Sequence, residues 1–202
     1  MSVRALFFDV GGVLGTNGWD RAARRRAAAE FHLDWEELEE RHELLAADFD
    51  NGRITLDQYL ERIVLYCQRP FSREAFREFM YAQSQPNPGS LAIVAELARS
   101  GRYLLATLNN ESAELHRYRI ERFGLRGLFT VFFTSCYLGV RKPDEKIYRL
   151  AMALTQREPE ECLFVDDRAL NVESAARLGI PAIRFQSAGQ LREELERRGV
   201  LP

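Results

Sequence analysis

The sequence has 202 residues, of which 46% are apolar, and its 28 basic and 30 acidic side chains give a formal charge of −2. This length and apolar content allow a sizeable core in one domain, or in a domain with an inserted module, and they exclude global disorder. The near-balanced charge excludes the broad electropositive surface that nucleic acids and anionic membranes require. We therefore expect neither a nucleic-acid nor a membrane partner.

The first apolar run, at residues 6–10, is interrupted by Asp9 and followed by Gly11 and Gly12. It is too short for a secretion signal or a membrane span. A short apolar run that ends at glycine is typical of a strand buried on both faces. The run therefore predicts a strand that delivers Asp9 into a glycine turn.

The segment at residues 18–85 contains no convincing strand and at least four candidate helices, which predicts a helical insert. Thr55 and Gln58 form a capping box at the start of one of these helices. The apolar face of that helix is formed by Leu56, Tyr59, Leu60, Ile63, Val64 and Cys67. Pro86, Pro88 and Gly89 disfavour helix continuation, so residues 86–89 are predicted to be a linker after the insert.

Similar apolar runs follow the insert at residues 103–108, 131–134, 162–165 and 182–185. They alternate with helical segments, whose ends are marked by glycines at positions 101, 124 and 179. Strands that alternate with helices predict an α/β fold, in which a Rossmann-like parallel sheet with right-handed crossovers is flanked by helices.

Functional groups gather at the carboxyl ends of the strands in open parallel sheets. The polar residues that follow the apolar runs are Asp9, Asn109, Asn110, Lys142, Asp166 and Asp167. One carboxylate after a strand is usually a turn residue, and an adjacent acidic pair can simply cap a helix. Three carboxylates with a lysine instead indicate a site, because adjacent like charges require a compensating cation. Hard oxygen ligands of this kind suit Mg²⁺.

Short motifs in a fixed order resemble those of the haloacid dehalogenase-like hydrolase superfamily along essentially the whole chain. The first is Phe-Asp-Val-Gly-Gly-Val-Leu at residues 8–14, and the others are Thr-Leu-Asn-Asn at 107–110, Arg-Lys-Pro-Asp at 141–144 and Phe-Val-Asp-Asp at 164–167 with Asn171. The resemblance implies a hydrolase core at residues 1–17 and 86–202. The insert at residues 18–85 would be its helical cap.

The resemblance also implies the chemistry of the site. Asp9 would attack phosphorus and form an aspartyl-phosphate, while Lys142 neutralises the phosphoryl oxygens. Mg²⁺ would be held by Asp9, the Gly11 carbonyl, and the acidic pair, with Asp167 in direct contact and Asp166 in support. The residues that would contact the substrate are Gly11, Gly12, Asn109 and Asn110.

Two positions depart from the phosphatase pattern of this superfamily. Gly11 stands where those phosphatases usually carry an aspartate that protonates the leaving oxygen, a contribution worth about 10²–10⁴ in rate. We therefore predict a preference for activated leaving groups, such as those of sugar-1-phosphates. Leu108 stands where a hydroxyl normally contacts the phosphoryl group. Thr107 faces the opposite side of the strand, which leaves Asn109 as the expected replacement.

The leading prediction is a magnesium-dependent hydrolase of a small phosphorylated metabolite. A 2-haloacid dehalogenase is an alternative, because halide leaves without a proton. However, dehalogenases of this superfamily work without a metal and have no match to the acidic pair Asp166-Asp167. They also need an arginine that binds the substrate carboxylate, and none is evident next to the first motif. A third alternative, supported by Gly11 and Leu108, is a phosphate-binding regulatory protein with weak catalysis.

The cysteines are Cys67, Cys136 and Cys162, and their spacing matches neither a zinc site nor a redox motif. They are predicted to be small buried residues in a reducing compartment, and the protein is predicted to be cytoplasmic. The sequence leaves the identity of the substrate and the oligomeric state open.

Overall fold

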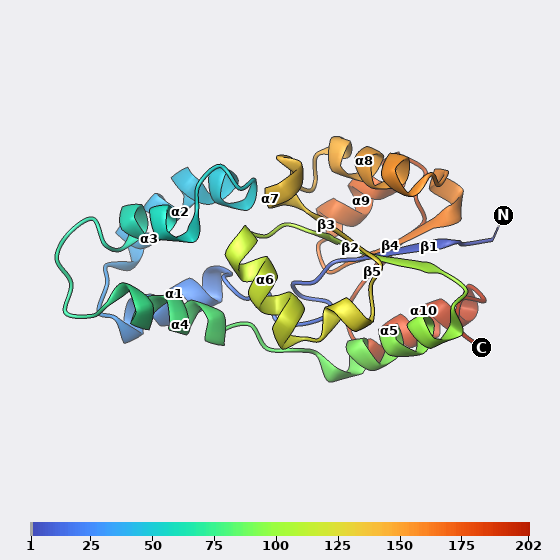
Figure 1. Cartoon of the computed structure of the whole chain (residues 1–202), viewed down its shortest axis with the longest axis horizontal. Helices are drawn as coiled ribbons and strands as arrows, with labels where there is room; N and C mark the ends of the chain where they lie inside the picture. Colours follow the sequence, from blue (N-terminus) through green and yellow to red (C-terminus); the bar gives the residue numbers. More distant parts are fainter. Residues whose placement is uncertain (1) are drawn as a thin grey trace.

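A computed structural model describes residues 2–202, in which a parallel sheet has the strand order β3-β2-β1-β4-β5. The strands are β1 (Ala5–Phe8), β2 (Leu104–Asn109), β3 (Val131–Thr134), β4 (Cys162–Asp166) and β5 (Ala182–Arg184). They coincide with the predicted apolar runs. The predicted Rossmann-like α/β fold is therefore confirmed (Figure 1).

Helices cover both faces of this sheet (Figure 1). They are α5 (Pro88–Ser100) and α10 (Ala188–Arg197) on one face, and α8 (Glu145–Thr155) and α9 (Ala169–Arg177) on the other. Leu6 and Phe8 pack towards the first pair, whereas Phe7 packs towards the second. Because both faces are buried, each strand is a continuous apolar run rather than an alternating one. Two further α-helices, α6 (Ala113–Arg122) and the short α7 (Ser135–Leu138), belong to the sheet domain.

Between β1 and α5 the chain forms α1 (Arg21–Glu30), α2 (Trp35–Asp50), α3 (Leu56–Ile63) and α4 (Arg73–Ala82). We call α1–α4 the cap helices. They lie beyond the carboxyl ends of the strands, on the side of the molecule opposite to the termini (Figure 1). Their apolar side chains form a separate cluster around Tyr59 and Phe76, which Leu115 of α6 joins. The cap helices therefore have a core of their own and pack on the sheet domain through α6.

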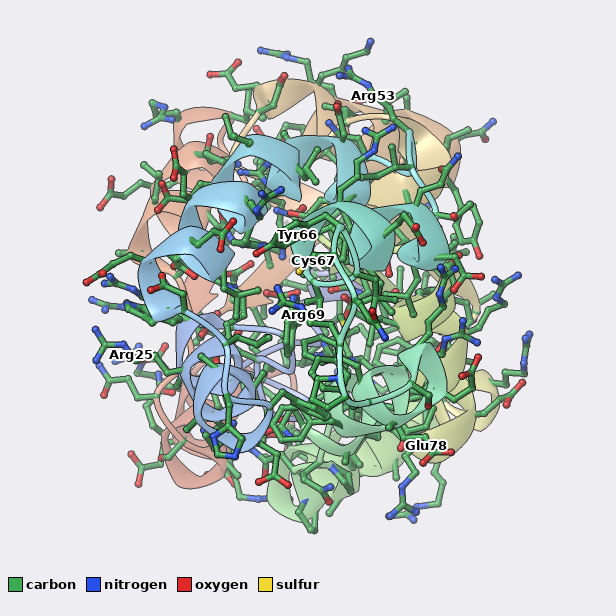
Figure 2. The ribbon with its side chains drawn as sticks, turned by 90° about the vertical axis from the view of Figure 1, so that its left-hand side faces the viewer. Arg25, Arg53, Tyr66, Cys67, Arg69 and Glu78 are labelled. Carbon is green, nitrogen blue, oxygen red and sulfur yellow. The ribbon has the colours of Figure 1, made fainter. Side chains whose placement is uncertain are left out.

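The helix α3 begins at the predicted capping box but is shorter than predicted. It ends at Ile63, where the Arg69 guanidinium donates a hydrogen bond to the Val64 carbonyl at 2.8 Å. An arginine at this place satisfies a carbonyl at the helix end. Cys67 therefore leaves the helix and is exposed beside Tyr66 in the connection to α4 (Figure 2).

The prediction that the cysteines are small buried residues is thus wrong for Cys67. Cys162 is buried in β4, and Cys136 is half-buried at α7. All three thiols are free. Within residues 2–202, no helix combines the length and the apolarity that crossing a membrane requires.

Two chain segments join the cap helices to the sheet domain, at residues 15–19 and 84–87, and we call them the hinge. They run side by side, because the Thr16 N–H donates to the Gln85 carbonyl at 2.8 Å and the Asn87 N–H donates to the Leu14 carbonyl at 2.8 Å. The predicted linker is shorter than residues 86–89, since Asn87 caps α5 and Pro88 opens that helix. Proline suits this position because its fixed φ is already helical and it needs no N–H there.

Candidate active site

Asp9 lies directly after β1, at the carboxyl edge of the sheet. Its N–H donates to the Val165 carbonyl of β4 at 2.9 Å, which continues the ladder between the two strands. Its Oδ1 accepts from the Val10 N–H at 2.8 Å and lies 2.9 Å from Lys142 Nζ. Asp9 is only 7% exposed. The carboxylate is therefore held in one orientation, as a nucleophile should be.

Lys142 lies between two carboxylates, with its Nζ 2.9 Å from Asp9 and 2.6 Å from Asp166. Burial by itself would lower the pKa of Lys142, but the charges of Asp166 and Asp9 outweigh it and raise this pKa. Asn110 holds the lysine backbone, since its Oδ1 accepts from the Lys142 N–H at 2.8 Å and its Nδ2 donates to the Lys142 carbonyl at 2.9 Å. The Asn110 side chain, predicted near the substrate, thus positions Lys142.

Asp166 is fully buried and well supplied with hydrogen-bond donors. Asn171 Nδ2 lies 3.0 Å from both of its carboxylate oxygens, and the Arg168 N–H donates to Oδ1 at 2.8 Å. Together with Lys142, these donors engage both oxygens. The geometry of Asp166 therefore suits a supporting role.

The Asp167 carboxylate has fewer hydrogen-bond donors than that of Asp166. Its Oδ2 accepts from Asn17 Nδ2 at 3.1 Å, whereas its Oδ1 is buried and lacks a hydrogen-bond partner among residues 2–202. Gly12 explains how this side chain fits, because a β-carbon on residue 12 would lie 2.2 Å from Asp167 Oδ2. Gly12 also has a φ of 75°, which favours glycine. Asp167 therefore offers an open oxygen towards the site.

The arrangement of these carboxylates fits a divalent cation. One oxygen from each of Asp9, Asp166 and Asp167 can be chosen so that all lie within 4.8 Å of one another. Burial raises the pKa of Asp9 to about 8, Lys142 opposes this rise, and the charges of Asp166 and Asp167 add to it. An excess of negative charge and an unpartnered buried oxygen are what a hard cation such as Mg²⁺ would satisfy.

The end of β2 places Asn109 and Leu108 on opposite sides. Leu108 packs in the apolar cluster under α8 and α9, so its side chain has no polar contact to make. Thr107 is in register with Phe8 and fully buried, and its hydroxyl has no partner within the described part of the chain. Asn109 is 2% exposed, and its Nδ2 is likewise without a partner in that part. This amide nitrogen can donate to an oxyanion.

A buried ion pair that the sequence did not reveal lies beside Gly11. Glu111 Oε2 is 2.8 Å from Arg119 Nη1, and the two side chains are 10% and 3% exposed. Arg119 Nη1 would lie 3.4 Å from a β-carbon on residue 11, and Arg119 Nε donates to Ser84 Oγ of the hinge at 3.1 Å. Glu111 follows the asparagines after β2, so the rule of strand ends could have found it. No comparable pattern in the sequence indicates that Arg119 belongs to the site.

The cap helices touch the sheet domain next to Lys142. Asp50, at the end of α2, forms an ion pair with Arg141 at 2.7 Å, and its carbonyl accepts from Ser135 Oγ of α7. Gly52 packs so tightly here that a β-carbon would lie 2.3 Å from the Cys136 carbonyl oxygen. These contacts close the cap helices over the carboxyl edge of the sheet.

Comparison with known proteins adds to this geometry. A family model described as haloacid dehalogenase-like hydrolase matches residues 3–179. Flavin mononucleotide hydrolase 1 of Arabidopsis thaliana is 28% identical over 81% of this chain, which spans 65% of that protein's length. Phosphatase MT3486 of Mycobacterium tuberculosis is 28% identical, and the match covers 98% of this chain and 94% of the phosphatase.

The fold also matches solved structures. The magnesium complex of the HAD family enzyme bt-2542 from Bacteroides thetaiotaomicron superposes with a TM-score of 0.81 at 20% identity. The match covers 98% of this chain and 100% of that one. At this identity the likeness concerns the fold.

Proposed function

The chain belongs to the haloacid dehalogenase-like hydrolases, and we propose that it is a magnesium-dependent phosphatase of small phosphorylated metabolites. The observation that carries this proposal is the unbalanced cluster in which Asp9 is held beside Lys142 while Asp167 keeps an unpartnered oxygen. The phosphatase that matches nearly the full chain supports the same reaction class. The proposed compartment is the cytoplasm, where thiols stay reduced.

In the proposed reaction, the Asp9 carboxylate forms a bond to phosphorus while the bond to the ester oxygen breaks and the alcohol leaves, and water then displaces Asp9 from the aspartyl-phosphate to release phosphate. The Val10 N–H and Lys142 orient this carboxylate, and the Lys142 ammonium also compensates the charge of the phosphoryl oxygens. Asn109 Nδ2 donates a hydrogen bond to one of those oxygens. We assign residues 18–85 as the cap that excludes water from this step.

The residues present fit a magnesium ion. Asp9, Asp167 and the Gly11 carbonyl would hold it, with Asp166 in support. Bound Mg²⁺ would polarise a phosphoryl oxygen and offset the negative charge of the cluster. Gly12 contributes by leaving room for Asp167, and its backbone is the part that can approach the phosphate.

Activated esters are proposed to react fastest, because Gly11 brings no acid to the leaving oxygen and any proton must come from a residue outside the first motif. The leaving oxygens of sugar-1-phosphates and aryl phosphates depart with less proton assistance than those of simple alkyl phosphates. This preference concerns only the leaving group, and the cap helices are proposed to select the rest of the metabolite.

Dehalogenation is less well supported. The structure does place an arginine, Arg119, beside the first motif, but Glu111 already occupies it at 2.8 Å. The acidic pair would also have no use in a metal-free displacement of halide. A purely regulatory role would leave the buried Lys142 and the open oxygen of Asp167 without a function.

The experiment is an assay of the purified protein with a panel of phosphate esters, with and without MgCl₂. We expect metal-dependent release of phosphate that Asp9→Asn lowers by at least about 10³-fold. Asp20→Asn is the matched control, since Asp20 caps α1 and asparagine caps equally well. Metal-independent release of halide from a 2-haloacid, or no turnover of any ester, would contradict the proposal.

A further inference from the structure

We propose that Glu111 is the general acid and base of the reaction, and that Arg119 holds it beside the leaving group, at the place where residue 11 has no side chain. This inference rests on the proposed phosphatase function. It assigns a catalytic residue to the proton transfer that Gly11 cannot perform.

The position of the pair is the first reason. A β-carbon on residue 11 would lie 3.4 Å from Arg119 Nη1, and that nitrogen is 2.8 Å from Glu111 Oε2. The Glu111 carboxylate therefore lies no further from this place than the sum of the two distances. Glu111 also follows Asn109 closely in the chain, so acid and phosphate contact come from the same strand end.

The second reason is that the other acidic groups nearby have roles of their own, as partners of Lys142 or Arg141 or, for Asp167, as a ligand of the proposed magnesium ion. Lys142 lies between Asp9 and Asp166, and Asp166 is saturated by its donors. Asp50 is paired with Arg141. Glu111 is 7% exposed and pairs through Oε2 with Arg119, whose Nη2 has no partner within residues 2–202.

Protonation of Glu111 is consistent with this role. Burial raises the pKa of Glu111 to about 7, the charge of Arg119 opposes the rise, and Asp50 adds to it. The charge of Glu111 in turn adds to the rise that burial causes in the pKa of the Cys136 thiol. A group with a pKa near the working pH is present in both forms, as a residue that first gives and then takes a proton must be.

The proposed step balances as follows. Asp9 attacks phosphorus, the bond from phosphorus to the ester oxygen breaks, and its electron pair stays on that oxygen, which takes the proton of the Glu111 carboxyl and leaves as the alcohol. Water then attacks the phosphorus of the aspartyl-phosphate and gives a proton to the Glu111 carboxylate. The bond to Asp9 breaks with its electron pair on the aspartate, which releases phosphate and regenerates both side chains.

Arg119 is a positioning residue that links Glu111 to the hinge. Its Nε donates to Ser84 Oγ in one hinge segment, and its Nη2 packs on Gly18 in the other, where a β-carbon would lie 1.7 Å away. Gly18 has a φ of 65°, so glycine is required there for both reasons. The Arg119 guanidinium thus positions Glu111 while it contacts both hinge segments.

The test is the dependence of kcat/KM on the pKa of the leaving group, measured with MgCl₂ for a series of aryl and alkyl phosphates. We expect Glu111→Gln to lower kcat/KM for alkyl phosphates by about 10²-fold or more. For p-nitrophenyl phosphate, which needs no proton, the loss should stay below about fivefold. Glu121→Gln, an exposed glutamate of α6, is the matched control.

A rescue variant separates catalysis from folding. In the Glu111→Gln background, Gly11→Asp should restore alkyl phosphate turnover at least about tenfold, because it brings an acid back to the leaving group. The new β-carbon would meet Asn17 Oδ1 at 3.3 Å and Arg119 Nη1 at 3.4 Å, which are side-chain ends that can shift, and backbone Asn17 Cα at 3.6 Å, an ordinary van der Waals contact. Arg119→Lys should steepen the leaving-group dependence in the same direction.

The outcomes are distinct. A loss that is equal for aryl and alkyl phosphates, or no loss at all, overturns the role of Glu111. If Glu111→Gln does not fold, Glu111→Asp, which keeps the charge and shortens the reach, must show a selective loss on alkyl phosphates, and an unselective one overturns the inference. A wild-type protein that hydrolyses no phosphate ester overturns the proposed function instead.

Discussion

Two groups of buried charged side chains can be compared, one between the cap helices α1 and α2 and the other at the carboxyl edge of the sheet. In the first, Arg24 pairs with Glu39 through two contacts of 2.7 and 2.9 Å, and Arg24 Nη1 donates to the Trp19 carbonyl at 2.8 Å. The two side chains are 8% and 12% exposed. The largely exposed Arg21 adds a longer contact to Glu39 at 3.4 Å, so the anion of this group is fully compensated and the Arg24 guanidinium has partners on both sides.

In the second group, the ammonium of Lys142 meets Asp9 and Asp166, and Asp167 lies close by with an oxygen that has no partner among the described residues 2–202. Burying such an excess of negative charge is costly unless a further cation compensates it. A balanced pair indicates a structural role, whereas an unbalanced cluster indicates a ligand. This difference separates the cap pair from the candidate active site, and it can be tested variant by variant.

The largest effect is expected for Lys142→Met. Removing the ammonium leaves Asp9 and Asp166 buried side by side, which should lower the free energy of unfolding by about 3–5 kcal/mol in the absence of magnesium. It should also lower kcat/KM for phosphate esters by about 10²–10³, since the phosphoryl charge loses its counter-charge. Urea unfolding and steady-state kinetics measure the two effects.

The control for this variant is Lys146→Met, because Lys146 is an exposed lysine at the start of α8. It should retain both activity and stability. A Lys142→Met protein whose kcat/KM stays within about tenfold of the wild type would show that the cluster does not stabilise phosphoryl charge.

The next effect concerns Arg24 and Glu39, which we call the cap pair. Breaking this pair should lower stability and leave the catalytic rate unchanged. Arg24→Met leaves the mostly buried Glu39 with only the longer contact to Arg21 at 3.4 Å, which should lower the free energy of unfolding by up to about 3 kcal/mol. The double variant Arg24→Met/Glu39→Leu should recover most of this loss, because a pair of apolar side chains replaces the ion pair. Urea unfolding of the single and double variants gives the coupling.

The folded cap variants should hydrolyse activated esters at the wild-type rate. The exposed pair of Arg53 and Asp48 supplies the control, since breaking it should change stability far less. Strictly additive losses in Arg24→Met/Glu39→Leu would contradict the interpretation of the cap pair as a balanced unit.

A third, smaller effect is the gain in stability on adding magnesium, which should depend on the active-site cluster and not on the cap pair. At about 100 times its dissociation constant, Mg²⁺ should raise the free energy of unfolding by about 2.7 kcal/mol. Asp167→Asn should abolish this gain, whereas Arg24→Met should keep it. Asp34→Asn, which preserves the cap of α2, is the matched control for the aspartate change. Equal stability with and without MgCl₂ would exclude the magnesium site.

The sequence was most informative where one residue type determines the local structure. Each buried strand is an apolar run, and the rule that strand ends meet at one edge brings Asp9 and Asp166 together before any coordinates are known. Alternation along β2 likewise turns Leu108 away from Asn109. These features depend on neighbours in the chain and on the general geometry of parallel sheets.

Other features depend on contacts that no local pattern encodes. The early end of α3 follows from a loop arginine, Arg69, that reaches the Val64 carbonyl, so the periodic apolar face continued beyond the helix. Asn17 contacts Asp167 only because the hinge folds back over the glycine turn. Arg119 comes to lie beside Gly11 through the packing of α6, and its role in the site depends on that placement.

The smallest expected effect is a loss of stability at low pH, which one histidine of the cap helices and one of the sheet domain both cause. Burial lowers the pKa of His42 to about 4 from its ordinary value of 6.5, and nearby Arg24 adds to this. His42 lies in α2 with Nδ1 2.6 Å from Tyr59 Oη. Burial also lowers the pKa of His116 in α6 to about 4, with nearby arginines adding to it.

Because the folded pKa lies below the unfolded one, the unfolded chain binds more protons between these values, and stability falls as the pH falls. From pH 6.5 to about 5, each histidine should cost roughly 1–2 kcal/mol of unfolding free energy. His42→Gln and His116→Gln should each remove their own share of this pH dependence, measured as the difference from the wild type in urea unfolding. A difference that stays constant with pH would mean that the replaced imidazole has the same pKa in the folded and the unfolded chain.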